Sequence, residues 1–263
     1  MDGKVYVVTS GKGGVGKTTT VANLGTGLAK LGNKVALIDA DIGLRNLDVV
    51  MGLENRIVYD IVDVVENNCR LEQALIRDKR YSSLCLLPAA QTRDKTAVSP
   101  EQMEGLCAEL KKDFDYVIVD SPAGIEQGFK NAIAGADESV VVTTPEVSAV
   151  RDADRIIGIL EAEGVSEPRL IINRIRIDMI NRGDMMDIED IIEILAIELL
   201  GVVPEDEKIV ISTNKGEPVV LSESAKAGEA FWNISQRVIG EEIPLISLEE
   251  GFVDRLKRLV GFK

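Results

Sequence analysis

The chain has 263 residues, of which 45% are hydrophobic and 4% aromatic, and its formal net charge is −14. That length allows one large hydrophobic core, or two. The acidic balance argues against broad electrostatic binding to nucleic acid, and the absence of histidine removes the commonest general base and metal ligand.

Short β-branched runs alternate with helix-length amphipathic segments along the chain. Strands are expected at 5–10, 34–40, 83–89, 116–122, 138–144, 169–174 and 199–204. Helices are expected at 16–31, 99–112, 148–163, 187–197 and 222–240. Most of the strand runs are continuously apolar, which is typical of strands covered on both faces. We therefore expect an α/β fold with a single doubly wound, mostly parallel β-sheet flanked by helices.

A glycine-rich stretch, GKGGVGKT at 11–18, lies between the first expected strand and the first expected helix. It matches G-x-x-x-x-G-K-[ST], the phosphate-binding P-loop, in which backbone N–H groups converge on a phosphate at a helix N-terminus. Lys17 can reach the β- and γ-phosphates, and the Thr18 hydroxyl can ligate Mg²⁺. The residues expected to bind the nucleotide here are Gly11, Lys12, Gly13, Gly14, Val15, Gly16, Lys17, Thr18 and Thr19.

Carboxylates follow two of the expected strands. Asp39 ends the second strand, with Asp41 and Asp48 in the loop beyond it, and Asp120 ends the apolar run YVIVD. Ligands of doubly wound sheets collect at the carboxyl ends of the strands. We expect Asp39 and Asp120 to join Thr18 at the Mg²⁺ ion, directly or through water. The alternative is that such aspartates only cap the following helix, and for Asp48 that alternative is favoured.

Neither a membrane-spanning segment nor a targeting segment is indicated. No run approaches the roughly 20 consecutive apolar residues that a spanning helix needs. The opening MDGKVYVVTS has no basic region and no small-residue cleavage site. Cys69, Cys85 and Cys107 stand far apart without C-x-x-C spacing, so we expect reduced structural thiols. These features predict a cytoplasmic protein.

The last residues differ in composition from the rest. After an acidic stretch, residues 252–263 carry four basic side chains and one acidic side chain, a net charge of +3. On a helical wheel, one apolar stripe is formed by Phe252, Val253, Leu256, Leu259 and Val260, while Arg255, Lys257 and Arg258 lie elsewhere. This pattern is typical of a helix that lies in a membrane interface, and equally of a terminal helix docked on the core. We place a domain boundary at 250, with an ATPase domain at 1–250 and an amphipathic tail at 251–263.

Several stretches together resemble one family. KGGVGKT with its early lysine, DADIGLRNLD and DSPAGI are similar to the deviant Walker A ATPases of the MinD/ParA family. The resemblance continues through PAAQTRDKTA (88–97), TTPEVSAVRDADR (143–155), RGDMM (182–186) and GEPVV (216–220) into the tail. It therefore covers nearly the whole chain.

The resemblance implies a Mg²⁺-dependent ATPase with ATP as its nucleotide. In this family the early lysine, here Lys12, crosses to the nucleotide of a second subunit in an ATP-bound homodimer. Together with Lys17 it would act in catalysis, and Asp41 would orient the attacking water. Asn173 resembles the position that contacts adenine, although a strand-end asparagine can equally form a turn. Residues 204–208 are expected near the same pocket.

The resemblance also implies a biological role. A dimerising switch of this kind binds an anionic membrane on the inner face of the cell in its ATP state, hydrolyses ATP slowly to release, and positions the cell-division machinery. The tail residues Phe252, Leu256, Leu259, Val260, Arg255, Lys257 and Arg258 would contact the membrane. Regulators similar to MinC and MinE are implied as partners, and nucleic acid is not. The alternatives are an ATPase of the same family that positions flagella or other structures and, less favoured, a DNA-segregation ATPase of the ParA type.

Overall fold

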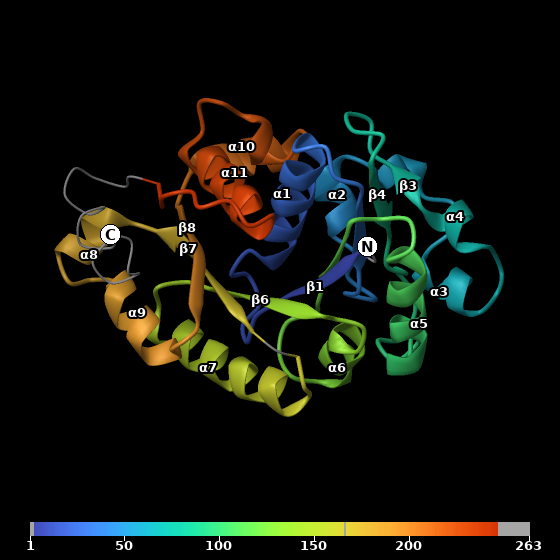
Figure 1. The fold of residues 1–263 in the computed structure, drawn as a ribbon, viewed down its shortest axis with the longest axis horizontal. Coiled ribbons are helices and arrows are strands. Elements are labelled where there is room, and N and C mark those ends of the chain that lie inside the picture. Colours follow the sequence, from blue (N-terminus) through green and yellow to red (C-terminus); the bar gives the residue numbers. More distant parts are fainter. Residues whose placement is uncertain (1–2, 166, 247–263) are drawn as a thin grey trace.

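The continuously apolar runs form the strands of one sheet in the computed structural model, which describes residues 3–165 and 167–246 (Figure 1). The strand order is β3-β4-β2-β5-β1-β6-β7-β8, and every neighbouring pair is parallel except β3 with β4. The strands are β1 (Lys4–Thr9), β2 (Val35–Asp39), β3 (Ile76–Arg77), β4 (Leu84–Leu87), β5 (Tyr116–Asp120), β6 (Glu138–Thr143), β7 (Arg169–Ile175) and β8 (Glu198–Pro204). The predicted fold class and all seven predicted strands are confirmed.

Helices connect the parallel strands, as parallel pairing requires. The α-helices are α1 (Lys17–Lys30), α2 (Leu47–Met51), α3 (Ile61–Val65), α4 (Leu71–Ala74), α5 (Pro100–Leu110), α6 (Gln127–Ile133), α7 (Val147–Ala162), α8 (Ile177–Asn181), α9 (Ile188–Leu195), α10 (Glu207–Asn214) and α11 (Lys226–Val238). Two 3₁₀ turns, η1 (Glu54–Arg56) and η2 (Val219–Leu221), complete the described elements. The five predicted helices are α1, α5, α7, α9 and α11. The other α-helices have four to eight residues, and most of them are too short for a helical period to be recognised in the sequence.

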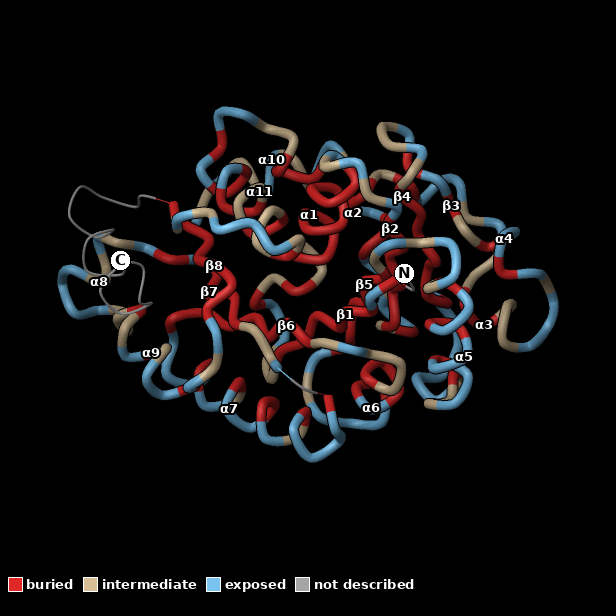
Figure 2. Tube along the Cα trace, viewed as in Figure 1, coloured by how far each residue is buried: buried red, intermediate tan, exposed pale blue. Residues whose placement is uncertain are grey.

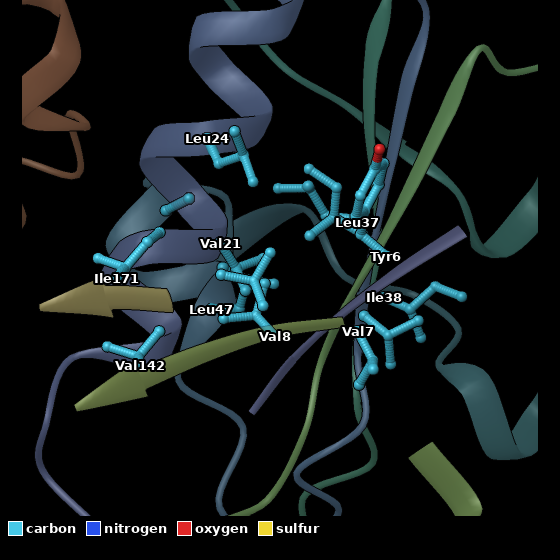
Figure 3. Packing of buried hydrophobic residues seen from close by; sticks show 14 of the residues in the cluster. Tyr6, Val7, Val8, Val21, Leu24, Leu37, Ile38, Leu47, Val142 and Ile171 are labelled. Carbon is cyan, nitrogen blue, oxygen red and sulfur yellow. The ribbon is translucent and has the colours of Figure 1, made fainter. Parts of the chain in front are cut away.

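The sheet lies between two layers of helices, with α1 and α11 on one face and α6 and α7 on the other (Figure 1). Burial follows this arrangement, because the strands are buried along their length while the outer surfaces of α7 and α9 are exposed (Figure 2). Side chains alternate across the sheet: Val8 and Leu37 point toward Val21 and Leu24 of α1, whereas Val7 points to the opposite face (Figure 3). The sheet is therefore apolar on both faces.

The topology brings the predicted site residues to one edge of the sheet. The P-loop follows β1, and Asp39 and Asp120 end β2 and β5, which flank each other in register. No helix within the described ranges is both long and apolar enough to cross a membrane. The predicted tail, 251–263, lies outside the described residues, so the boundary at 250 remains a prediction.

Candidate functional site

The P-loop has a backbone conformation that depends on its glycines. Gly14 and Gly16 have φ of +80° and +103°, in the left-handed region that side chains disfavour. A Cβ on Gly16 would lie 2.3 Å from Nδ2 of Asn173, and one on Gly11 would lie 2.3 Å from the carbonyl oxygen of Asp152. Asn173 and Asp152 therefore pack closely against the loop. The loop leads directly into the N-terminus of α1, where backbone N–H groups favour an anion.

Lys17 is the buried cation of this loop. Its Nζ donates a hydrogen bond of 3.0 Å to Oγ of Ser10, the residue after β1. Burial lowers the pKa of the Lys17 ammonium, and the charges of Asp120 and Asp41 oppose that effect. A lysine held among carboxylates at the start of a helix is placed to meet phosphate oxygens.

Asp39 and Asp120 are buried side by side, because they are partners in the parallel register of β2 and β5. Oδ1 of Asp39 accepts from the N–H of Asp41 at 3.0 Å, and Oδ2 accepts from the N–H groups of Asn46 and Leu47 at 3.2 Å. Burial nevertheless raises the pKa of Asp39 to about 7. Burial, followed by the charge of Asp39, raises the pKa of Asp120 well above its usual range.

These groups fit a magnesium ion. Oδ1 of Asp120 is buried and has no hydrogen-bond partner among the described residues, and the Thr18 hydroxyl lowers the pKa of the same carboxyl group. Hydroxyl and carboxylate oxygens are the ligands that Mg²⁺ prefers, and Mg²⁺ commonly takes only one or two protein carboxylates and completes its shell with phosphates and water. Within the described ranges, no three His, Cys, Asp or Glu side chains form a metal site by themselves.

Asp41 is half-buried beside the same carboxylates. Burial raises its pKa, and the ammonium groups of Lys95 and Lys17 lower it. Lys95 belongs to the 88–97 stretch, which is part of the family resemblance but suggests no role by its sequence. The N–H of Gly43 donates to the carbonyl oxygen of Ala90 at 2.8 Å and so fastens this stretch to the loop that carries Asp41. Lys95 is thus a site residue that sequence reasoning missed.

Helix α2 helps to position Asp39, because the N–H groups at its start donate hydrogen bonds to that carboxylate. At its start, Asp48 is buried and lies 3.0 Å from Nε of Arg45, so the structure places it in an ion pair and not at the phosphate loop. At its end, the guanidinium of Arg80 donates to the carbonyl oxygens of Met51 and Gly216, each at 3.0 Å. The helix is therefore fixed at both ends.

Lys12 lies apart from the buried cation. Its Nζ is 3.0 Å from Oε2 of Glu146 and 3.2 Å from Oγ of Ser148, at the start of α7, and its side chain is 42% exposed. A surface ion pair therefore holds the Lys12 ammonium at the start of α7, away from Lys17. Sequence reasoning did not find this contact, because Glu146 is 134 positions away along the chain.

Asn173 is buried near the end of β7 and contacts the P-loop. Its Nδ2 donates to the carbonyl oxygen of Val15 at 2.8 Å, and its Oδ1 accepts from the N–H of Arg174 at 2.9 Å. A carboxamide has a second N–H and a second lone pair, which leaves capacity for a base edge. The predicted adenine contact therefore remains a prediction, and the observed contact is with the loop.

Comparison with known proteins agrees with this geometry. Residues 6–219 match the family described as the CobQ/CobB/MinD/ParA nucleotide binding domain. The chain is 58% identical over 266 aligned positions to the septum site-determining protein MinD of Bacillus subtilis, covering 99% of both chains.

Solved structures show the same fold. One is the MinC:MinD cell division protein complex of Aquifex aeolicus, at 52% identity and a TM-score of 0.87, covering 93% of this chain and 99% of that one. Another is the septum site-determining protein MinD of Pyrococcus horikoshii, solved with Mg-ADP, at 28% identity and a TM-score of 0.82, covering 91% of this chain and 99% of that one.

The buried carboxylate of Asp39 predicts a pH effect on stability. A pKa raised from 3.8 to about 7 means that ionisation costs more in the folded protein than in the unfolded chain. Without nucleotide or Mg²⁺, the free energy of unfolding should therefore fall as pH rises from about 4 to about 7, by at most about 4 kcal/mol from this group. Urea unfolding across this range should show the fall, and Asp39→Asn should reduce it.

The matched control for this measurement is Asp113→Asn, which neutralises an exposed aspartate. It should leave the slope of stability against pH unchanged. A stability that stays level or rises between pH 5 and 7 in the unmodified protein contradicts the assignment.

Proposed function

The chain belongs to the CobQ/CobB/MinD/ParA family of nucleotide-binding proteins, and we propose that it is a Mg²⁺-dependent ATPase that acts as a dimerising, membrane-binding switch in placing the cell-division site. Identity of 58% over 99% of a septum site-determining protein supports the division-site role over the flagellar and DNA-segregation alternatives. The P-loop, with its buried Lys17 and paired carboxylates, supports ATP as the nucleotide. The related Pyrococcus protein was solved with Mg-ADP.

The chemistry that this site can perform is phosphoryl transfer to water. The P-loop amides and Lys17 would hold the β- and γ-phosphates, and Thr18, Asp39 and Asp120 would hold Mg²⁺. When bound, that ion neutralises charge on the phosphate oxygens. Burial raises the pKa of both aspartates, so their ionised forms would be stabilised by a nearby cation, which supports this assignment.

Asp41 is suited to orient the attacking water. Burial raises its pKa, and the charges of Lys95 and Lys17 oppose that rise and so favour the ionised, hydrogen-bond-accepting form. Positioning and electrostatics provide most of the catalysis in phosphoryl transfer, and there is no histidine in the chain to serve as a base. Turnover should therefore be slow in the isolated protein, as befits a timed switch.

The observation that carries the proposal is the position of Lys12. Its ammonium is bound to Glu146 and Ser148 on the surface, while Lys17 alone is buried in the loop. A cation that reaches a nucleotide from another subunit stabilises transition-state charge as an arginine finger does. Exposed ion pairs contribute only about 0–1 kcal/mol, so the pair with Glu146 is easily exchanged for a partner's phosphates. Hydrolysis would then depend on dimerisation.

Membrane attachment would depend on the dimer as well. We assign 1–250 to the ATPase domain and 251–263 to a membrane-binding tail, whose apolar stripe and +3 charge suit an anionic surface. One short amphipathic helix binds weakly. Two tails on one dimer gain roughly 10²–10⁴ in avidity if both reach the membrane. ATP binding would thereby become membrane binding on the inner face of the cell membrane.

Partners follow from the same assignment. The related Aquifex protein was solved in a complex with MinC, so we propose a MinC-like protein as a partner of this chain. A MinE-like regulator that speeds hydrolysis would give the slow switch a release step.

The two P-loop lysines should differ in their effects. Lys17→Ala should abolish ATP binding, because it removes the buried cation from the phosphates. Lys12→Ala should keep the ATP affinity of the monomer while losing ATP-dependent dimerisation and turnover. Nucleotide titration and analytical ultracentrifugation with ATP test both variants. The control is Lys130→Ala, which removes a similarly exposed lysine paired with Glu163, and it should behave as the unmodified protein. Normal dimerisation and hydrolysis by Lys12→Ala would show that the cross-subunit role is wrong.

Membrane binding should need the tail and ATP together. Deleting 252–263 should leave ATP binding intact and prevent sedimentation with anionic vesicles, and Leu256→Glu should do nearly the same because it places a charge on the apolar stripe. Arg258→Glu should act through electrostatics, so its effect should shrink on neutral lipid and at high salt. The full chain should sediment with vesicles in ATP and mostly stay in solution in ADP. Equal sedimentation in both nucleotides contradicts the two-tail argument.

A further inference from the structure

Arg80 joins two segments that are far apart in the sequence. It follows β3, the strand at one edge of the sheet, and its guanidinium donates to the carbonyl oxygens of Met51 and Gly216, each at 3.0 Å. The same group is paired with Asp78, whose carboxylate accepts from Nε at 3.0 Å and from Nη2. These bonds use four of the five N–H donors that a guanidinium carries.

The pair with Asp78 fixes the direction of the guanidinium. The Asp78 side chain is fully buried, whereas that of Arg80 is 24% exposed. Burial raises the pKa of Asp78, but hydrogen bonds from Arg80 and Tyr81 together with the charge of Arg80 outweigh burial and lower it overall. Asp78 is therefore a buried, compensated anion. A planar guanidinium that is held by such a partner presents its remaining N–H groups in fixed directions.

One of the two carbonyl groups belongs to the helix that holds Asp39. Met51 is the last residue of α2. At the other end of this helix, the N–H groups of Asn46 and Leu47 donate to Oδ2 of Asp39 at 3.2 Å. The helix has five residues and is about 7.5 Å long, too short to be stable alone, so its position depends on its contacts with the rest of the protein. A displacement at Met51 would therefore move the N–H groups that meet Asp39.

The other carbonyl group is that of Gly216, the first residue of the GEPVV stretch at 216–220. Its backbone touches that of Gly52, the residue after α2: both have φ of +65°, and a Cβ on Gly216 would lie 2.5 Å from Cα of Gly52. The same stretch is fixed to α1, because the N–H of Val220 donates to Oδ1 of Asn23 at 2.8 Å. Arg80 therefore bridges α2 to a segment that is itself fixed to the helix of the phosphate loop.

We propose that Arg80 is a positioning residue for the Mg²⁺ site, which fixes α2 against the segment at 216–220 and so aims the carboxylate of Asp39 at the ion. The inference rests on the proposed function, because it takes Asp39 as one of the groups that hold Mg²⁺. Groups that orient a metal ligand typically contribute 10–100-fold to metal affinity. Lys17 and the P-loop amides lie at the start of α1, so nucleotide binding without Mg²⁺ should change little when α2 moves.

Lysine at this position separates the two tasks of Arg80. In Arg80→Lys, an ammonium still compensates the buried charge of Asp78, so the fold should be kept. An ammonium is a point charge without the planar fork of a guanidinium, so it does not bridge two carbonyl oxygens and a carboxylate in fixed directions. The matched control is Arg77→Lys, which makes the same change at an exposed arginine of β3 and should behave as the unmodified protein.

A second variant tests the bridge from its other side. Gly216→Ala leaves the pair of Arg80 and Asp78 intact but places a Cβ against Gly52, so the contact between 216–220 and α2 must open. It should change the Mg²⁺ site in the same direction as Arg80→Lys. The control is Gly164→Ala, which imposes similar backbone strain at a φ of +79° where a Cβ would meet nothing within 4 Å.

The test measures ADP binding to the full chain by isothermal titration calorimetry, because ADP avoids hydrolysis. Arg80→Lys should need roughly tenfold more Mg²⁺ than the unmodified protein to reach half of the effect of Mg²⁺ on ADP affinity. Its affinity for ADP in EDTA should be unchanged. A general loss of stability would instead reduce ADP binding equally with and without Mg²⁺. In the protein without nucleotide or Mg²⁺, the amides of Asn46 and Leu47 should exchange hydrogen several-fold faster in Arg80→Lys, as measured by NMR.

Two results overturn the inference. One is a Mg²⁺ requirement that is unchanged in Arg80→Lys and Gly216→Ala, or that changes equally in their controls. The other is a fall in ADP affinity that is equal with and without Mg²⁺, which makes Arg80 a residue of the fold alone. Failure of the proposed function would look different, since the unmodified protein would then bind no ADP with Mg²⁺. In that case, unchanged exchange at Asn46 and Leu47 overturns the positioning role.

Discussion

The site is organised around two carboxylates that the sheet forces together inside the protein. Asp39 and Asp120 end neighbouring parallel strands in register, so their side chains meet where water is excluded. Burial raises the pKa of both carboxyl groups, and the charge of Asp39 raises that of Asp120 further. Backbone N–H groups at the start of α2 offset part of this cost for Asp39, and the Lys17 charge offsets part of it for Asp120. The part of the ionisation cost that is not offset would be reduced by a cation bound together with a phosphate.

Lys17 is buried beside these carboxylates, so a second cation would have to approach the phosphates from outside the loop. Lys12 is near the front of the same loop, yet it is fixed by an exposed pair with Glu146. Pairs of this kind are weak, because water screens both charges. A buried, compensated lysine and an exposed, weakly held one are therefore suited to different tasks, one within the subunit and one between subunits.

The sequence allowed us to predict the positions of residues that are determined by the order of strands, loops and helices. A P-loop between a strand and a helix, and aspartates at the ends of apolar strands, have positions that follow from topology alone, so Lys17, Asp39 and Asp120 could be brought together before any coordinates. Contacts between distant segments could not. Glu146 is 134 positions from Lys12, and no period or spacing relates them. Lys95 and Arg80 lie in loops, and the sequence pattern of a loop does not show which residues its side chains will contact. Asn173 was placed correctly near the end of a strand, but its bond to the P-loop joins residues 158 positions apart.

The central claim is that Lys12 completes the active site of a second subunit. It is tested most directly by mixing Lys12→Ala subunits with Asp41→Ala subunits and measuring phosphate release from ATP. Each variant alone should be nearly inactive. In a mixed dimer, the Lys12→Ala subunit keeps its own Asp41 and receives Lys12 from its partner, so one complete site forms and hydrolysis should reappear as the second variant is added. If the mixtures stay as inactive as the separate variants at concentrations where mixed dimers are shown to form, Lys12 acts within its own subunit and the account is wrong.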